Sequence, residues 1–161
     1  MNILTMNRYD IQKAYIDFPH IVISITDDDQ FFPNIPEKNC KGVLRIAVWD
    51  TEDGVYFRSL YNFGAPRIPK DKIFHELHAR RILEFVHSHL HEVEMIICQC
   101  DAGMSRSAGT AAALSKIFRG SEGIFFKPPY IPNKLIYETI LNEYRHIQKL
   151  DPGADTESGQ A

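Results

Sequence analysis

Four short apolar runs along the chain have the pattern of β-strands. They lie at Asn2–Thr5, His20–Ile25, Val43–Trp49 and Met95–Cys100. The second run, HIVISI, is β-branched and largely apolar instead of alternating with polar residues, which is typical of a strand buried on both faces. Strands of this kind occur in mainly parallel sheets whose two faces are covered.

Segments with helical periodicity follow these runs. A short helix is expected after the first strand, with Asn7 capping its first turn. Apolar spacing predicts an amphipathic helix from Lys72 to about His89 and another helix from about Ser105 to Phe118. A last helix opens at Pro132. The alternation predicts an α/β fold of three layers, with a central, mainly parallel sheet of about four strands flanked by helices.

The composition narrows the class of protein without naming a function. The chain of 161 residues fits one domain, placed at 1–150, and ends in a polar, flexible tail at 151–161. A net charge of −3 offers no positive field for nucleic acid, and no apolar run approaches the roughly 20 residues that cross a membrane. Three cysteines, an odd number, favour a reducing cytoplasmic location. The oligomeric state stays open.

Two chemically interesting residues stand at the ends of predicted strands. Ligand sites in parallel sheets lie beyond the carboxyl ends of the strands. Cys100 ends the fourth apolar run, and Asp50 directly follows the third. We therefore expect both residues at the same edge of the sheet.

The stretch CDAGMSRS, from Cys100 to Ser107, joins a strand to a helix. A helix start offers unpaired backbone N–H groups, Gly103 allows a tight turn, and the planar fork of Arg106 matches phosphate oxygens. Together they predict a cradle for phosphate or a similar oxyanion. A cysteine in such a place favours the thiolate, which is the nucleophilic form.

The same stretch resembles the signature of the cysteine-based protein tyrosine phosphatases, most closely the small dual-specificity-like branch of bacterial and phage type. The resemblance extends weakly over most of the chain. It implies a metal-independent phosphatase, with no cofactor, in which Cys100 attacks phosphorus and forms a phosphocysteine intermediate. Arg106 and the N–H groups of the loop would hold the oxygens, and Ser107 would assist departure of the sulfur. The loop residues so implied are Asp101, Ala102, Gly103, Met104, Ser105 and Arg106.

The resemblance also implies an aspartic acid that protonates the leaving oxygen. Asp50 ranks first because it follows the third strand directly, where the acid loop of the family begins. Asp53 is the alternative, and Asp71 is third. One departure concerns the residue before the nucleophile, which is His in most of the family and Gln99 here. A glutamine carries no charge, so the thiol could be less acidic and the enzyme slower.

Several other readings remain open. The cradle could belong to a catalytically weak module that binds phosphate esters, or to a thiol-based redox or arsenate-reducing enzyme with Cys98 or Cys40 as the resolving thiol. The histidines of HELH lack the spacing of a zinc motif, and those of HSHLH lie near a predicted helix end, where cationic or hydrogen-bonding side chains suit the last turn, so no metal is expected. The acidic run after the second strand, TDDD, is interpreted as facing solvent.

The substrate class follows from the loop composition. The interior of the loop holds no Lys or additional Arg, which disfavours polyphosphorylated substrates. A phosphorylated protein or a small aryl phosphate is the expected partner, with inorganic phosphate or a similar oxyanion in the site. Whether phosphotyrosine is preferred over phosphoserine or phosphothreonine is left open.

Overall fold

The four apolar runs form one sheet in the computed structural model, which describes residues 1–52 and 68–150. The strands are β1 (Asn2–Met6), β2 (His20–Thr26), β3 (Cys40–Ala47) and β4 (Met95–Gln99). Their order is β1-β4-β2-β3, and every neighbouring pair is parallel. All seven residues of β2 are buried, which explains why its sequence is largely apolar instead of alternating with polar residues.

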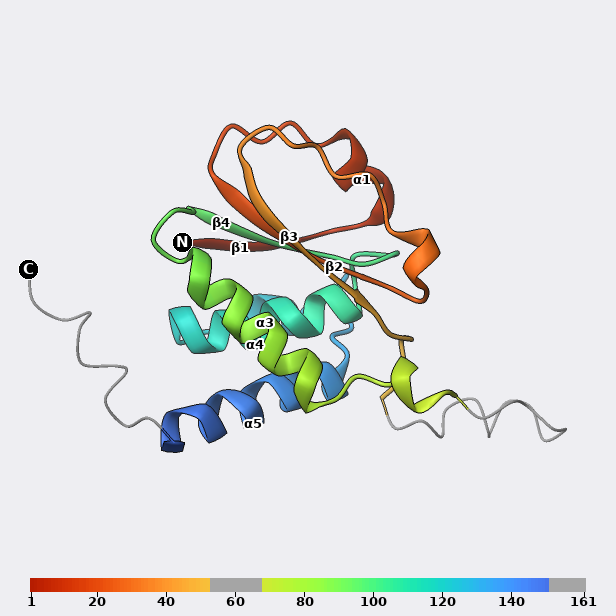
Figure 1. Ribbon diagram of the computed structural model, residues 1–161, viewed down its shortest axis with the longest axis vertical. Helices are drawn as coiled ribbons and strands as arrows, with labels where there is room; N and C mark the ends of the chain where they lie inside the picture. Colours follow the sequence, from red (N-terminus) through yellow and green to blue (C-terminus); the bar gives the residue numbers. More distant parts are fainter. Residues whose placement is uncertain (53–67, 151–161) are drawn as a thin grey trace, which may run out of the picture.

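Helices cover both faces of this sheet, as Figure 1 shows. The short helix α1 (Arg8–Lys13) lies on one face. On the other face α3 (Glu76–His89) and α4 (Arg106–Arg119) pack against the strands, and α5 (Lys134–Leu150) packs against these two helices. The expected α/β, three-layer arrangement is confirmed.

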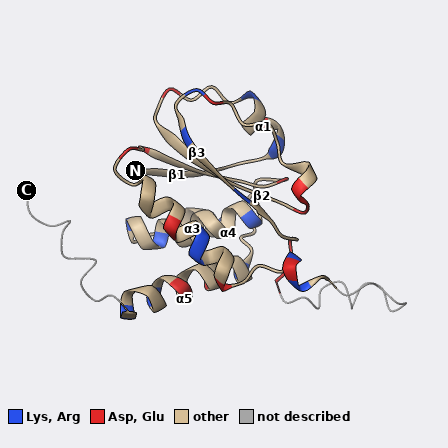
Figure 2. Cartoon of the chain, in the orientation of Figure 1, with Lys and Arg blue, Asp and Glu red and all other residues tan. Residues whose placement is uncertain are grey.

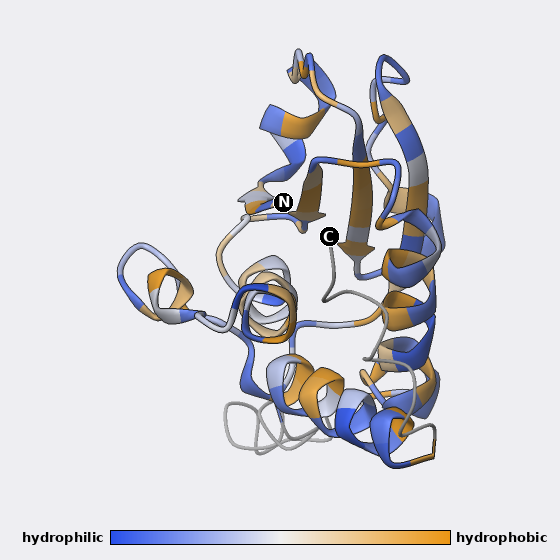
Figure 3. Ribbon diagram, turned by 90° about the vertical axis from the view of Figure 1, so that its left-hand side faces the viewer, coloured by the Kyte–Doolittle hydropathy of each residue, from blue (hydrophilic) through white to orange (hydrophobic). Residues whose placement is uncertain are grey.

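The hydrophobic core is unequal on the two sides of the sheet. The larger cluster fills the space between the strands and α3, α4 and α5, where Ile82, Leu114 and Ile136 are fully buried. The smaller cluster centres on Ile11 of α1, which packs with Val22 and Ile97. In Figure 3 the strands are mostly hydrophobic, whereas the helices carry alternating hydrophobic and hydrophilic turns. This amphipathic pattern is what a helix needs to cover a sheet.

Element boundaries differ from the sequence predictions where polar contacts decide them. The third strand runs over Cys40–Ala47, not Val43–Trp49, and the Trp49 N–H instead donates to the Lys72 carbonyl at 2.8 Å. The helix expected from Lys72 begins only at Glu76, because the His75 side chain accepts the Leu77 N–H and caps it there. Residues Lys70–Lys72 form a separate 3₁₀ turn, η2.

Two further 3₁₀ turns, η1 (Asp29–Phe31) and η3 (Gly123–Phe126), lie in connections. The Asn7 cap is confirmed: its side chain accepts the N–H groups of Tyr9 and Asp10. Asp53 and the tail 151–161 lie outside the described residues. None of the helices in the part of the chain that the structure describes is long and apolar enough to span a bilayer.

Candidate active site

The loop between β4 and α4 brings the predicted nucleophile beside its predicted helper. Cys100 follows the last residue of β4 and is 2% exposed. Its Sγ lies 3.1 Å from Oγ of Ser107, in the first turn of α4. The turn between them contains Gly103 at φ 71°, a left-handed conformation that favours glycine. The loop predicted from the sequence is therefore present, with its sulfur at the carboxyl end of a central strand.

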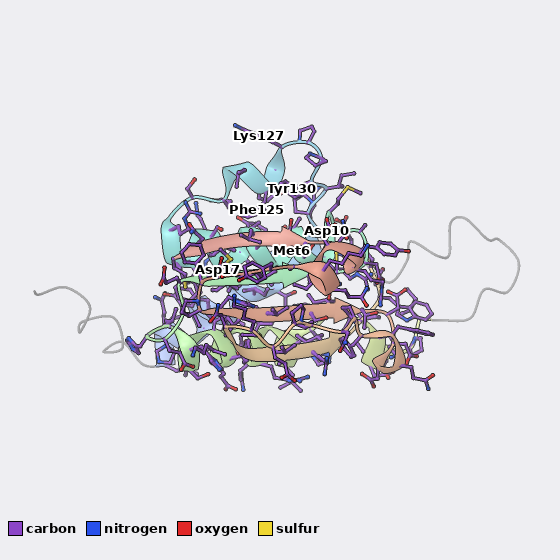
Figure 4. All side chains as sticks on the ribbon, turned by 90° about the horizontal axis from the view of Figure 1, so that it is seen from above. Met6, Asp10, Asp17, Phe125, Lys127 and Tyr130 are labelled. Carbon is purple, nitrogen blue, oxygen red and sulfur yellow. The ribbon has the colours of Figure 1, made fainter. Side chains whose placement is uncertain are left out.

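The corner between β1 and α1 forms a wall behind this loop. The Cys100 N–H donates to the Met6 carbonyl at 3.4 Å, and the Arg8 N–H donates to the Asp101 carbonyl at 3.2 Å. A Cβ on Gly103 would stand 2.8 Å from the backbone nitrogen of Asn7. Figure 4 labels Met6 on this corner. The close backbone approach, in addition to the positive φ, requires glycine at position 103.

Arg106 is held by acceptors from three parts of the fold. Its side chain is buried, and Nη1 donates to Asp27 Oδ1 at 2.5 Å and to the Val48 carbonyl at 2.8 Å. Nη2 donates to Asp101 Oδ2 at 2.9 Å. Nε finds no partner among the described residues. Because a guanidinium has five N–H donors, these three bonds fix its plane and leave two donors for an oxyanion.

The first carboxylate of the acidic run after β2 is exposed to solvent, as expected, and it also contacts the loop. Asp27 directly follows β2, and its side chain, although 59% exposed, forms an ion pair with Arg106. The sequence pattern did not indicate this pair because it joins residues 79 positions apart. Parallel strands bring the two residues to one edge of the sheet.

The carboxylate of Asp101 lies between two arginines. Its Oδ1 accepts from Nε of Arg8 at 2.8 Å and from Nη2 of Arg8 at 2.7 Å. The same Nη2 donates to Thr26 Oγ1 at 3.1 Å. Figure 2 shows acidic and basic residues together at the edge where the strands end. Arg8 is thus a second cation beside the loop, whose own sequence contains only Arg106.

Asp50, the first-ranked acid, reaches the far end of the loop. Its Oδ1 accepts the Ser105 hydroxyl at 2.8 Å and the side-chain amide of Asn133 at 2.9 Å. Asp71 lies exposed in η2, and the bond from Trp49 to Lys72 keeps η2 alongside the segment that carries Asp50. The alternative, Asp53, lies outside the described residues.

Gln99 and Cys98 are both fully buried in β4. Oε1 of Gln99 accepts the Ser24 hydroxyl at 2.5 Å, while its Nε2 has no acceptor among the described residues. Burial raises the pKa of the Cys98 thiol strongly, and the neighbouring Cys100 raises it further. The three cysteines are free thiols. Cys98 is therefore held as a neutral thiol.

A segment after α4 borders the loop with apolar side chains. The Ile131 N–H donates to the Met104 carbonyl at 2.9 Å. Met104 is 39% exposed and Ile131 is 73% exposed, so both side chains are open to a ligand at this rim. Figure 4 places Phe125, Lys127 and Tyr130 together on the same segment.

Three residues that contribute to the site were missed by the sequence analysis: Arg8, Asp27 and Asn133. Asn133 is buried, and its Oδ1 accepts the Ile136 N–H at 3.0 Å, so it caps α5, while its Nδ2 reaches Asp50. An asparagine directly after Pro132 and before a helix is a recognisable cap signal. For Arg8 and Asp27 no local signal exists.

Within residues 1–52 and 68–150, no three His, Cys, Asp or Glu side chains gather closely enough to hold a metal ion. The chemistry that these residues can supply is that of a thiol, an arginine and carboxylates around an oxyanion-sized loop.

Comparison with known proteins places the fold. No family model and no curated protein sequence matches the chain. Among solved structures it is similar to a mouse putative dual specificity phosphatase complexed with zinc tungstate, at 15% identity, with a TM-score of 0.59 over 92% of this chain and 85% of that chain. It is also similar to a variant of human DUSP28, at 14% identity, with a TM-score of 0.58 over 92% of both chains.

A third solved structure is Tk-PTP in its active form, at 14% identity, with a TM-score of 0.52 over 90% of this chain and 92% of that chain. A fourth is a human tyrosine phosphatase-like serine/threonine/tyrosine-interacting protein, at 17% identity, with a TM-score of 0.51 over 81% of this chain and 78% of that chain. At these identities the likeness establishes the fold, which is that of the dual-specificity and protein tyrosine phosphatases.

Proposed function

We propose that this chain, which has the fold of the dual-specificity phosphatases, hydrolyses phosphomonoesters, with phosphotyrosine or a related aryl phosphate as its substrate. The observation that carries the proposal is the pairing of Cys100 and Arg106 on one loop. The sulfur lies 3.1 Å from the Ser107 hydroxyl, and the Nε–H of the buried guanidinium has no acceptor within residues 1–52 and 68–150. A thiol with an adjacent hydroxyl and a preoriented oxyanion donor suits covalent phosphoryl transfer.

In the first step the Cys100 thiolate attacks phosphorus. An S–P bond forms while the bond from phosphorus to the ester oxygen breaks, and the leaving oxygen takes a proton from Asp50. The three equatorial oxygens are held by Arg106 and by backbone N–H groups of the loop, from Asp101, Ala102, Gly103, Met104 and Ser105. Asp50 suits the role of acid because its contact with Ser105 holds it at the rim of the loop.

In the second step water attacks the phosphocysteine. Asp50 accepts a proton from the water as the new P–O bond forms and the S–P bond breaks. The Ser107 hydroxyl donates to the departing sulfur, and inorganic phosphate leaves with the thiolate regenerated. No step needs a metal or cofactor to balance.

The apolar rim supports an aryl leaving group. Met104 and Ile131 are open beside the loop and can contact the ring of a phosphotyrosine. Phenolate is also a better leaving group than an alkoxide, so it needs less help from the acid.

The proposal is tested by hydrolysis of para-nitrophenyl phosphate from pH 4 to 9 with a chelator present. We expect a bell-shaped profile for the wild type, no turnover for Cys100→Ser, and loss of the basic limb for Asp50→Asn. An Asp50→Asn variant that retains the wild-type profile would move the acid to Asp53 or Asp71. Turnover that persists in Cys100→Ala would refute the cysteine mechanism.

A second candidate function is binding of phosphate esters without turnover. It is favoured by Gln99, whose side chain is bonded to Ser24, and by the two carboxylates that already contact Arg106. One of the solved structures with this fold is described as a human tyrosine phosphatase-like serine/threonine/tyrosine-interacting protein. Calorimetric binding of orthovanadate by a wild type that shows no hydrolysis would decide for this function.

A further inference from the structure

Arg8 lies outside the loop but touches it through both its backbone and its side chain. The backbone N–H donates to the Asp101 carbonyl at 3.2 Å, and two side-chain donors reach Asp101 Oδ1 at 2.7 and 2.8 Å. Thr26, at the end of β2, accepts a further bond from the guanidinium. Arg8 is thereby fixed between the loop and the sheet.

The carboxylate that Arg8 holds is the one that orients Arg106. Asp101 uses Oδ1 for Arg8 and Oδ2 for Arg106, so one carboxyl group joins the two guanidinium groups. Rotation of the Asp101 side chain would break both contacts at once. The position of Arg106 therefore depends on a side chain that Arg8 holds in place.

Charge balance gives Arg8 a second effect on the same site. Arg106 forms ion pairs with two carboxylates, Asp27 and Asp101, whose charges oppose the attraction that it offers to an anion. Arg8 adds one positive charge within 2.7 Å of Asp101. The charges of these four side chains then sum to zero, whereas without Arg8 the remaining three charges would sum to −1. Without Arg8, an anionic ligand would therefore meet a net negative charge.

We propose that Arg8 is a positioning residue for the phosphate-binding loop, acting through Asp101 to orient Arg106 and to offset the carboxylate charge around it. The effect of Arg8 on catalysis rests on the proposed function, whereas its effect on oxyanion affinity does not. Arg8 contributes to affinity without touching the oxyanion, and its loss weakens oxyanion binding more than it slows the chemical step.

The test is a double-mutant cycle of Arg8→Met and Asp101→Ala, with orthovanadate as the probe and isothermal calorimetry as the readout. In the otherwise wild-type chain, Arg8→Met should raise the Kd for orthovanadate about tenfold. In the Asp101→Ala background only the loss of the Arg8 charge remains, so the same substitution should raise the Kd less than it does in the otherwise wild-type chain. Equal effects in both backgrounds would overturn the proposal, because they would mean that Arg8 does not act through Asp101.

Two further variants, Arg8→Lys and Arg80→Met, distinguish a positioning role of Arg8 from an effect on stability alone. Arg8→Lys keeps the charge and should recover part of the affinity lost in Arg8→Met. Arg80 forms a comparable ion pair with Glu143 between α3 and α5, at 2.7 Å, away from the loop. Arg80→Met should lower Tm and leave the orthovanadate Kd unchanged. If Arg8→Met behaves like Arg80→Met, lowering Tm with unchanged Kd, Arg8 is only structural and the proposal fails.

The kinetic arm separates this inference from the proposed function. With para-nitrophenyl phosphate, Arg8→Met should raise KM in step with the orthovanadate Kd and lower kcat less than about threefold, because Cys100 and Asp50 are untouched. A loss confined to kcat would overturn the proposal. If the wild type shows no turnover, hydrolysis is refuted, and the orthovanadate cycle still decides the role of Arg8.

Discussion

Asp50 and Asn133 lie 83 positions apart in the chain, and the side-chain amide of Asn133 donates to Asp50 Oδ1 at 2.9 Å. The same amide donates to the Thr51 carbonyl at 3.2 Å, while the Asn133 N–H donates to the Ser105 carbonyl at 3.1 Å. Asn133 thus ties the segment of the candidate acid to the loop of the candidate nucleophile. It does so from the cap of α5.

This relationship predicts that Asn133 supports the acid step. Asn133→Ser keeps a capping oxygen for α5 but is too short to reach Asp50. We expect hydrolysis of phenyl phosphate to fall about tenfold and that of para-nitrophenyl phosphate to fall less, because the poorer leaving group needs the proton more. Steady-state kinetics on the two esters checks this. Equal losses on both esters would show that Asn133 does not act through the acid.

Gly103 offers a test of the loop geometry. Gly103→Ala places a Cβ 2.8 Å from the Asn7 nitrogen at a φ of +71°, so we expect about 2–4 kcal/mol of destabilisation and loss of orthovanadate binding. Gly120→Ala is the matched control. Gly120 has a φ of +70° with nothing within 4 Å of a Cβ, so it carries the conformational cost alone, about 1 kcal/mol.

Urea unfolding of both glycine variants measures the two costs. Equal destabilisation by the two substitutions would contradict the close packing of the loop against the β1–α1 corner. Orthovanadate binding should be unchanged in Gly120→Ala, since that residue ends α4 at the end remote from Cys100.

His78 makes stability depend on pH. Burial lowers the pKa of His78 to about 4, and the neighbouring charges of His75 and Arg81 act in the same direction. The neutral ring also accepts the His75 N–H through Nδ1, which a protonated ring cannot do. Below its ordinary pKa near 6.5 the unfolded chain binds the proton more readily than the folded chain. This stabilisation is present above about pH 6.5 and is lost as pH falls toward 4.

Urea unfolding between pH 7 and pH 4 measures the effect. The free energy of unfolding should decline less in His78→Gln than in the wild type, since glutamine does not titrate. The control is His87→Gln on the exposed face of the same helix, which should follow the wild-type curve. A His78→Gln curve parallel to that of the wild type would refute the assignment.

The thiol of Cys98 is expected to be unreactive in the folded protein. Burial raises the pKa of its thiol, so iodoacetamide at pH 7 should modify Cys98 only after unfolding. Cys98→Ala should retain hydrolysis of para-nitrophenyl phosphate within about threefold. Cys40 begins β3 at the amino edge of the parallel sheet, whereas Cys100 follows the carboxyl end of β4. The two thiols therefore lie at opposite edges of the sheet, which disfavours Cys40 as the resolving thiol. Dithiol-dependent arsenate reduction abolished by Cys98→Ala would instead support the redox alternative.

The sequence by itself determined the layered fold and the candidate phosphate-binding loop. Strand patterns such as HIVISI and the spacing of Cys100, Gly103, Arg106 and Ser107 are local, and hydrophobic periodicity and turn geometry depend on neighbouring residues. These predictions could therefore be made without knowing which segments meet. The predicted element boundaries were wrong where a cap decided the boundary: the helix expected from Lys72 begins at Glu76, after its cap His75.

Only the tertiary structure decided which distant groups complete the site. Arg8, Asp27 and Asn133 join the loop through contacts with residues 28 to 93 positions away. A parallel sheet gathers the ends of all its strands at one edge, so residues with no sequence relationship become neighbours there. Asp27 in the TDDD run is exposed, as its local pattern indicates, but its partner is Arg106, which no local pattern places beside it.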